Sequence, residues 1–185
     1  MNYPHMETPI LNGTDQFILE GCRRKNRESQ RLLYEKYFEP LSWVCMRYLR
    51  NGEEVCDLVH EGFIKIFKNI HKYSGKGSLE GWMKRIVINN CLDYLRKINQ
   101  RPPDVPLTEV YDLELDENIL ADLEAEYILD LLQELVPLYR MVFNLSVIEG
   151  YPHKEIAHIL KIKESTSRAY LTAAKKEIRQ KLAAM

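Results

Sequence analysis

The chain has 185 residues, of which 45% are hydrophobic and 29% charged, with a formal net charge of −1. This composition indicates a soluble globular protein with one or two small domains. No apolar run approaches the roughly 20 residues that span a bilayer. The first residues also lack the basic and apolar parts of a signal peptide, so we expect a cytoplasmic protein without membrane insertion.

Helical periodicity runs through the N-terminal half, and no segment shows the alternation of a β-strand. Five helices are predicted there, over 14–24, 29–37, 40–49, 53–70 and 79–98. Pro40 is expected to start the third, because proline is favoured at a first helical position. The glycines and serines of HKYSGKGS, residues 71–78, predict a loop before the fifth helix.

Three prolines between positions 102 and 106 preclude a helix there and mark a domain boundary. Helical periodicity resumes at Glu117, breaks before Pro137 and stops at Glu149-Gly150. We therefore predict an all-α fold of two small helical domains, 1–100 and 117–185. A Pro-containing acidic linker, 101–116, joins them.

Residues 153–179, HKEIAHILKIKESTSRAYLTAAKKEIR, have the pattern of a helix-turn-helix. A short helix ends near Leu160, and Lys161 to Lys163 form a break of turn length. Glu164 and Ser165 then open a second helix with an acid and a hydroxyl at its positive end. Such a second helix can enter the DNA major groove. An ordinary helical hairpin with a solvated basic face is the alternative.

Charge is strongly segregated along the chain. Residues 61–101 hold nine Lys and Arg against three acidic residues, a net charge of +6. Residues 104–134 hold eleven acidic residues and no basic one, and residues 150–185 hold eight basic residues against three acidic ones. Two basic blocks around an acidic one indicate two surfaces that bind a polyanion.

The helix over 79–97 places an aromatic, an amide and two arginines along one side. These side chains are spaced by three and four residues, at Trp82, Arg85, Asn89, Asp93 and Arg96. With the nearby Lys72, Lys76 and Lys84, they suit single-stranded DNA, in which bases stack on aromatics and cations follow phosphates. Alternatively, Asp93 and Arg96 form an ion pair and Trp82 is half-buried core.

The chain resembles bacterial sigma factors of the extracytoplasmic-function (ECF) type. The resemblance rests on EEVCDLVHEGFIKIFK with GSLEGWMKRIVINNCLDYLRK, and on LLQELVPLYRMVFNLSVIEGYPHKEIAHIL with KIKESTSRAYLTAAKKEIRQKL. The two blocks match the family's regions two and four in this order. The resemblance implies a transcription initiation factor that binds core RNA polymerase and directs it to promoters, reading −10 and −35 elements.

The resemblance also implies roles for particular residues. The helix over 53–70 would dock on the polymerase clamp through Asp57, His60 and Glu61, with Phe63 supporting the packing; the usual residue at position 60 is Gln. The loop Tyr73–Gly77 and the helix after it would read the −10 element. Residues expected to contact −10 DNA are Lys72, Tyr73, Lys76, Trp82, Lys84, Arg85, Asn89 and Arg96.

The helix from Glu164 to Lys181 would enter the major groove at the −35 element. Residues expected to contact −35 DNA are Ser165, Thr166, Ser167, Arg168, Tyr170 and Lys175. Ser165 stands where the family has Gly, Ser167 where it has Val, and Tyr170 and Ala173 where it has basic residues. We therefore expect an unusual −35 preference.

The resemblance further implies an anti-sigma factor as a partner, and a linker that threads through polymerase channels. The acidic stretch 104–117 would act there as a mimic of nucleic acid, or it is merely a solvated linker.

Other functions find less support. Asp57-x-x-His60 and Glu155-x-x-His158 have the spacing of helical di-metal sites, but the further Glu ligands are not evident. A freestanding helix-turn-helix regulator would explain 153–179 but not the basic helix over 79–97. The cysteines Cys22, Cys45, Cys56 and Cys91 show no C-x-x-C pair, so no metal or cofactor is expected. No phosphate loop or nucleophile motif points to an enzyme.

Overall fold

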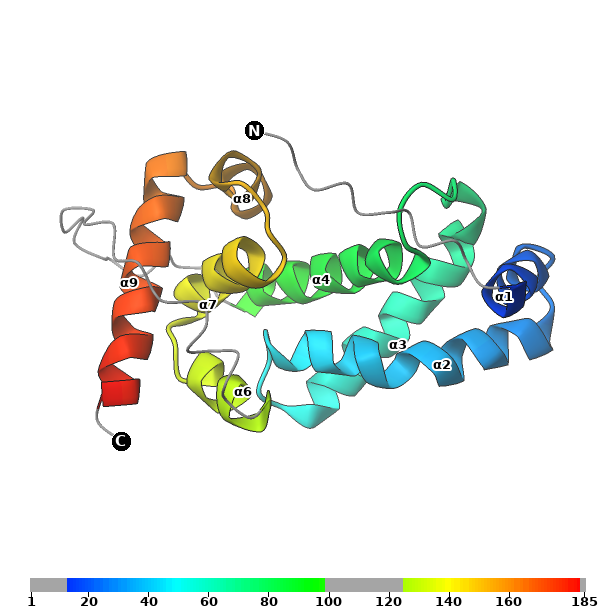
Figure 1. Ribbon diagram of the computed structural model, residues 1–185, viewed down its shortest axis with the longest axis horizontal. Coiled ribbons are helices and arrows are strands. Elements are labelled where there is room, and N and C mark those ends of the chain that lie inside the picture. Colours follow the sequence, from blue (N-terminus) through cyan, green and yellow to red (C-terminus); the bar gives the residue numbers. More distant parts are fainter. Residues whose placement is uncertain (1–12, 99–124, 184–185) are drawn as a thin grey trace. The chain divides into compact units, whose positions relative to one another are not determined.

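The computed structural model describes residues 13–98 and 125–183, and every regular element in these ranges is a helix (Figure 1). The all-α fold class is therefore confirmed. The described residues form two compact units. The first contains the residues up to 46 together with 51–91, and the second contains 47–50 and the residues from 92 onward. The predicted linker, 101–116, lies outside the described residues.

The first unit is built on α1 (Gly13–Arg23), α2 (Arg27–Met46), α3 (Gly52–Asn69), the 3₁₀ turn η1 (Ile70–Lys72) and the first part of α4 (Leu79–Ile98). Helix α1 packs closely on α2, because a Cβ on Gly21 would lie 1.9 Å from Ser29 Oγ. Asn51 caps α3 by accepting a hydrogen bond from Glu53 N–H. The loop predicted over 71–78 is shorter in the structure, because His71 and Lys72 belong to η1 and only 73–78 lies outside a helix.

Pro40 does not start a helix, contrary to the sequence prediction; it lies inside the continuous helix α2. Leu33, Tyr37, Leu41 and Val44 form one buried stripe that runs past the proline on both sides. Burying this stripe favours a single helix despite the N–H that proline lacks. The Ser42 hydroxyl also donates to the Phe38 carbonyl (2.7 Å), which satisfies one acceptor beside the proline.

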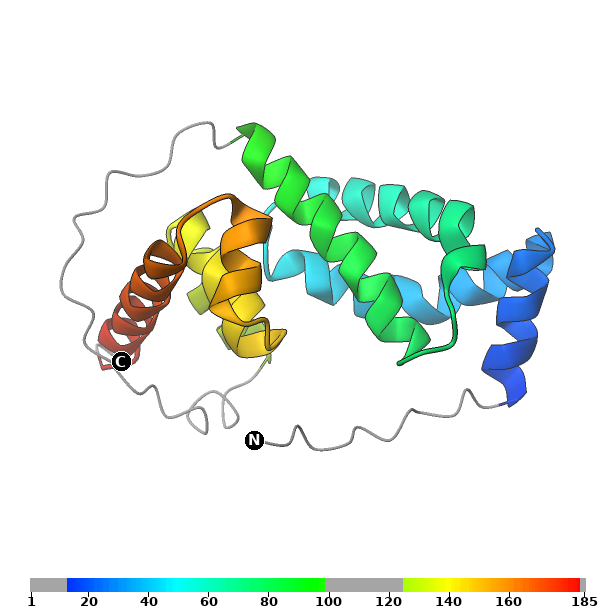
Figure 2. The ribbon, with the colours of Figure 1, turned by 90° about the horizontal axis from the view of Figure 1, so that it is seen from above.

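Helix α4 crosses α2 and α3 at an angle and closes the core of this unit (Figure 2). The crossing is close at Gly62, where an added Cβ would lie 2.8 Å from Val87 Cγ2. Asn90 is buried here and donates to the Leu58 carbonyl (3.4 Å). Cys22, Cys45 and Cys91 are buried in this unit as small apolar side chains, and Cys56 is partly exposed.

The second unit contains α6 (Ala125–Gln133), α7 (Pro137–Phe143), the π-helical turn η2 (Asn144–Ile148), α8 (His153–Leu160) and α9 (Glu164–Ala183). The predicted break before Pro137 and the stop at Glu149-Gly150 are confirmed. Val142, Ile156, Ala174 and Ile178 are completely buried or nearly so, and they hold α7, α8 and α9 together. No described helix is long and apolar enough to cross a membrane.

The helix-turn-helix geometry of residues 153–179 is confirmed. Helix α8 ends at Leu160, and its C-cap residue Lys161 adopts the left-handed conformation (φ 56°, ψ 42°). Its N–H and that of Ile162 bond to the Ala157 carbonyl, so the turn satisfies the free acceptor at the helix end. Lys161 occupies this conformation although glycine is the residue that adopts it without strain.

Candidate nucleic-acid interfaces

An exposed polar row lies along α3. Asp57, His60 and Glu61 are all solvent-exposed, as their proposed docking role requires. Ile64 continues the row and is 53% exposed, which is unusual for a large aliphatic side chain. Sequence reasoning missed Ile64, although its place outside the apolar stripe of the helix was visible in the spacing.

Beneath this row, an aromatic cluster fixes the position of His60. The Tyr34 hydroxyl lies 2.9 Å from His60 Nε2, and the rings of Phe38 and His60 are 5.7 Å apart. Phe63 is buried and packs against Tyr34 (4.8 Å between centroids) and Phe67 (5.9 Å). Phe63 thus supports the row from inside, and His60 is held on a surface that Tyr34 and Phe38 make rigid.

The exposed side of α4 carries Arg85 and Asn89 one turn apart, whereas the neighbouring Asn90 is buried. Trp82 is half-buried and lies against Tyr73, with ring centroids 5.7 Å apart. Arg96 forms an ion pair with Asp93 (2.5 Å), which was the alternative to DNA contact that the sequence left open for these two residues. The helix therefore presents an amide and a guanidinium beside an aromatic side chain, an arrangement suited to a base and its phosphate.

The loop before α4 presents backbone and lysines rather than an aromatic. Lys72 and Lys76 are exposed, and Lys84 pairs with Glu80 on α4 (2.7 Å). Tyr73 was expected to contact DNA, but it is only 3% exposed and its hydroxyl donates to the Gly77 carbonyl (2.7 Å). Burial also raises the pKa of Tyr73. We therefore assign Tyr73 to the support of the loop and not to its binding face.

Helix α9 separates into a buried and an exposed stripe. Ser165 and Arg168 are exposed, and Thr166 and Lys175 are partly exposed, in keeping with their proposed role. Ser167 and Tyr170, which we expected to contact DNA, are 0% and 7% exposed and lie in the core. The physical reason is their spacing, since both fall on the stripe that continues to Ala174 and Ile178. The Tyr170 ring packs on Tyr139, 5.3 Å away.

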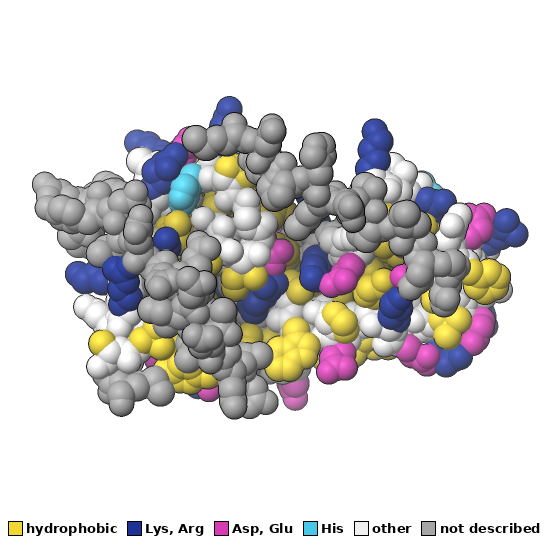
Figure 3. Space-filling model, in the orientation of Figure 1, with side chains coloured by type: hydrophobic (Ala, Val, Ile, Leu, Met, Phe, Trp, Pro, Cys, Tyr) yellow, Lys and Arg dark blue, Asp and Glu magenta, His cyan; other side chains and the backbone are white. Residues whose placement is uncertain are grey.

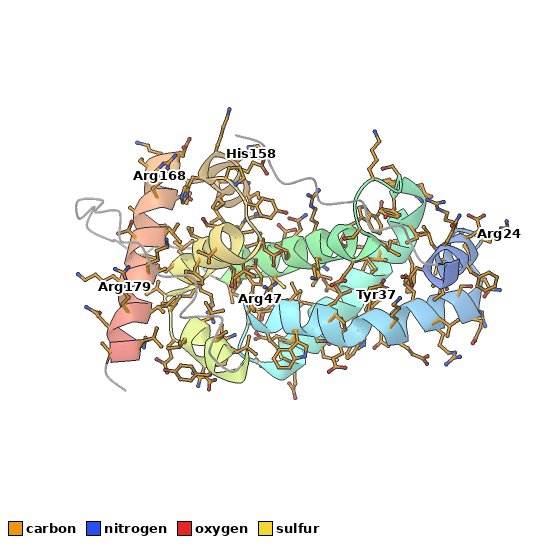
Figure 4. All side chains as sticks on the ribbon, in the orientation of Figure 1. Arg24, Tyr37, Arg47, His158, Arg168 and Arg179 are labelled. Atoms are coloured by element: carbon orange, nitrogen blue, oxygen red, sulfur yellow. The ribbon has the colours of Figure 1, made fainter. Side chains whose placement is uncertain are left out.

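The exposed stripe extends further than the sequence-based site residues. Thr172 is partly exposed and its hydroxyl donates to the Arg168 carbonyl (3.2 Å); Lys176 is exposed and Arg179 partly so. Figure 4 shows Arg168 and Arg179 near opposite ends of α9, and Figure 3 shows Lys and Arg side chains on the side of the molecule that α9 occupies. Steps of three and four residues from Arg168 would have predicted this stripe.

A hydrogen bond between His153 and Ser167 joins the first turns of α8 and α9. His153 Nδ1 lies 2.9 Å from Ser167 Oγ. Burial lowers the pKa of His153, and the nearby Arg168 lowers it further. Arg168 in turn pairs with Glu164 on its own helix (2.6 Å), which orients the guanidinium along the exposed stripe. The two helices are thus linked at the end that would face DNA.

The arrangement of the described side chains gives no support to the alternative of a helical di-metal site. Within residues 13–98 and 125–183, no three His, Cys, Asp or Glu side chains are grouped so that they could hold a metal ion. His60, one half of the Asp57-x-x-His60 pair, contacts Tyr34 and Cys56 instead.

Comparison with known proteins shows which family the chain resembles along most of its length. Residues 33–101 match the family model "Sigma-70 region 2", and residues 125–178 match "Sigma-70, region 4". The chain is 25% identical over 181 residues to the ECF RNA polymerase sigma-E factor of Haemophilus influenzae, covering 91% of this chain and 95% of that protein. It is 28% identical to the corresponding factor of Escherichia coli strain K12, with 91% and 94% covered.

A solved structure shares the fold. The structure titled "Structure of CnrH in complex with the cytosolic domain of CnrY" matches 92% of this chain and 97% of that chain, with a TM-score of 0.52 and 18% sequence identity. The similarity covers both units, so the order of helices in this chain is that of a known two-part architecture.

Proposed function

Since the chain belongs to the ECF family of RNA polymerase sigma factors, which direct the polymerase to promoters, we propose a division of labour between its two units. The first unit binds core polymerase through α3 and reads the −10 element through the loop 73–78 and α4. The second unit reads the −35 element through α9. The acidic linker, 101–116, connects the two readers.

The observation that carries this proposal is the two-sided character of α9. One side buries Ser167, Tyr170, Ala174 and Ile178. The other presents Arg168, Thr172 and Lys176 at the spacing that follows a major groove. A guanidinium suits guanine O6 and N7, whereas a lysine suits phosphate. The −35 contacts are therefore proposed for Ser165, Thr166, Arg168, Thr172, Lys175, Lys176 and Arg179.

In the first unit, the proposal separates protein contact from DNA contact. Asp57, His60, Glu61 and Ile64 give α3 a mixed acidic and apolar row, which suits a polymerase surface with basic and apolar side chains. Arg85 and Asn89, with the lysines at 72 and 76, suit the non-template strand of the −10 element. Trp82, which is partly exposed, is proposed to contact a base.

The experiment that tests the function is transcription in vitro on genomic fragments, with core RNA polymerase alone and with core plus this protein. New start sites that require the protein are expected, with shared sequences upstream of them. DNA binding is then measured with and without core. Weak binding alone and specific binding in the holoenzyme support a sigma factor; tight binding of the pure protein to an operator would instead identify a freestanding regulator.

We also propose that bond-forming chemistry belongs to the polymerase, so the protein is not an enzyme, and that it works in the cytoplasm. An anti-sigma factor is its proposed inhibitor, since the structural relative CnrH was solved in complex with the cytosolic domain of a second protein. Such an inhibitor would cover α3 or α9. The proposal predicts that it competes with core polymerase for the free protein in a pull-down of the three components.

A further inference from the structure

The two glycines at the centre of the loop 73–78 do not themselves hold it in one shape. Gly75 and Gly77 both adopt positive φ angles (79° and 78°), and no atom lies within 4 Å of a Cβ built on either. Glycine in open space loses more conformational freedom on ordering than any other residue. A loop of this kind that binds DNA in one conformation therefore needs an external support.

Tyr73 supplies part of this support, because its side chain reaches across the loop on the buried side. Its buried ring packs against Trp82 at the start of α4, and its hydroxyl donates to the Gly77 carbonyl (2.7 Å). One side chain thus ties the beginning of the loop to its end. Ser78 fixes the end of the loop, because its hydroxyl accepts a hydrogen bond from the Gly81 N–H (2.9 Å) in the first turn of α4.

Arg23 supplies the rest from a distant part of the sequence. It is the last residue of α1, and its Nη2 donates to the Tyr73 carbonyl (2.7 Å) across a separation of 50 residues. The end of α1 is itself fixed, because Gly21 allows the helix to press against Ser29 on α2, and an ion pair joins Lys36 of α2 to Asp15 of α1. Helix α1 lies beside η1, at the base of the loop.

We propose that Arg23 is a positioning residue for −10 recognition. Through the Tyr73 carbonyl it holds the loop, and so Lys76 and the backbone at Gly75 and Gly77, in the shape that receives the non-template strand. The inference rests on the proposed −10 role of this loop. A preformed loop binds DNA without the entropy cost of ordering two glycines, so loss of Arg23 weakens binding although Arg23 itself contacts no DNA.

The test uses the holoenzyme and the non-template-strand oligonucleotide of the strongest promoter mapped by transcription. Affinity is measured by fluorescence anisotropy for Arg23→Ala, for Tyr73→Phe, which removes one hydroxyl, and for the control Arg24→Ala. Arg24 is the adjacent arginine; it pairs with Glu20 (3.1 Å) and points away from the rest of the first unit (Figure 4). Thermal unfolding and core-binding titrations accompany each variant to verify folding and docking.

Arg23→Ala and Tyr73→Phe are each expected to bind the oligonucleotide about tenfold more weakly, the scale of one lost hydrogen bond of this kind. Core affinity should stay unchanged, and Arg24→Ala should behave as wild type. Discrimination against a substituted −10 base should also fall in both loop variants. The dependence of affinity on salt should be the same as in wild type, because no phosphate contact is lost.

Three results overturn the inference. The first is wild-type affinity and base discrimination in Arg23→Ala. The second is a reduced salt dependence in Arg23→Ala with wild-type behaviour in Tyr73→Phe, which would make Arg23 a direct phosphate ligand. The third is an equal loss of oligonucleotide affinity in Arg24→Ala, which would mean that the effect comes only from removing a positive charge. If the wild-type holoenzyme itself fails to bind the oligonucleotide, the proposed −10 role of the loop is wrong.

Discussion

At the scale of single residues, His153 makes the second unit sensitive to acid. Its pKa in the folded protein lies below the ordinary value of 6.5, because the ring is partly buried and near Arg168. The unfolded chain therefore binds the proton more readily than the folded one. The contribution of the neutral ring to stability is complete above the unfolded pKa and is lost as pH falls toward the lowered value.

We predict that His153→Gln flattens this pH dependence. A glutamine amide can still bond to Ser167 Oγ, but it does not titrate. Unfolding by urea, followed by circular dichroism at several pH values between 5 and 8, should show a smaller loss of stability on acidification than in wild type. The two proteins should be similar at pH 8. An identical slope in both would show that His153 does not carry the effect.

Gly62 tests the crossing of α3 and α4. A Cβ at this position meets Val87 Cγ2 at 2.8 Å, whereas nothing lies within 4 Å of a Cβ on Gly52 at the start of the same helix. We predict that Gly62→Ala lowers the free energy of unfolding by about 1–3 kcal/mol through overpacking. Gly52→Ala is the matched control and should be neutral or stabilising by about 0.5 kcal/mol.

Tryptophan fluorescence isolates this measurement to the first unit, because both tryptophans of the chain, Trp43 and Trp82, lie in it. Urea unfolding followed by this signal should shift to lower denaturant in Gly62→Ala alone. Equal midpoints for the two variants would mean that Val87 moves aside freely and that the crossing is not closely packed.

At the scale of elements, the turn between α8 and α9 carries strain at Lys161. A non-glycine residue in the left-handed conformation (φ 56°) costs free energy that glycine avoids. We predict that Lys161→Gly raises the stability of the second unit by about 0.5–1 kcal/mol. Lys163→Gly, two residues on and without a positive φ, should destabilise it because glycine there only adds freedom to the unfolded chain.

Thermal unfolding by circular dichroism measures both lysine variants, and tryptophan fluorescence should not change, since the first unit is untouched. A lower midpoint for Lys161→Gly would show that the lysine side chain contributes a contact worth more than the strain. Because Lys161 is exposed in the turn that precedes the proposed −35 recognition helix, transcription from a mapped promoter also tells whether its charge helps promoter binding.

The helices were predictable from sequence wherever one pattern decided the outcome, as in α3, α4 and the turn at Lys161. Pro40 misled the prediction because a buried stripe on both sides outweighs the missing hydrogen bond of a proline. Ser167 and Tyr170 were assigned to DNA by their family positions, although their spacing from Ala174 and Ile178 indicates the core. The role of Tyr73 was not predictable, because it depends on Arg23, a tertiary partner that no local pattern reveals.

At the scale of the whole molecule, two basic blocks of the sequence, 61–101 and 150–185, stand on either side of an acidic block, 104–134. Residues 104–134 carry eleven acidic and no basic side chains, and much of this block lies outside the described residues. We propose that this acidic segment competes with DNA for basic surfaces and for polymerase channels that later hold nucleic acid. This competition should help early steps of initiation and then be released by the growing transcript.

We predict that neutralising the linker impairs open-complex formation or early escape. The variant carries Asn or Gln at four acidic positions: Asp112, Glu114, Asp116 and Glu117. Transcription with the reconstituted holoenzyme should show an altered ratio of abortive to full-length product, with unchanged affinity for core polymerase. The free variant should also bind DNA of any sequence more tightly at low salt, since fewer carboxylates repel the DNA phosphates or compete with them for basic side chains.

The control for the linker variant removes the same amount of charge from the first unit, where four exposed glutamates become Gln: Glu28, Glu35, Glu39 and Glu53. If net charge alone matters, both variants gain non-specific DNA affinity and shift the product ratio equally. If the linker acts in a channel, only the linker variant changes the ratio, because the control glutamates lie on helices outside it. If the linker variant gives unchanged abortive and full-length yields, the acidic block is only a solvated linker and does not act as a mimic of nucleic acid.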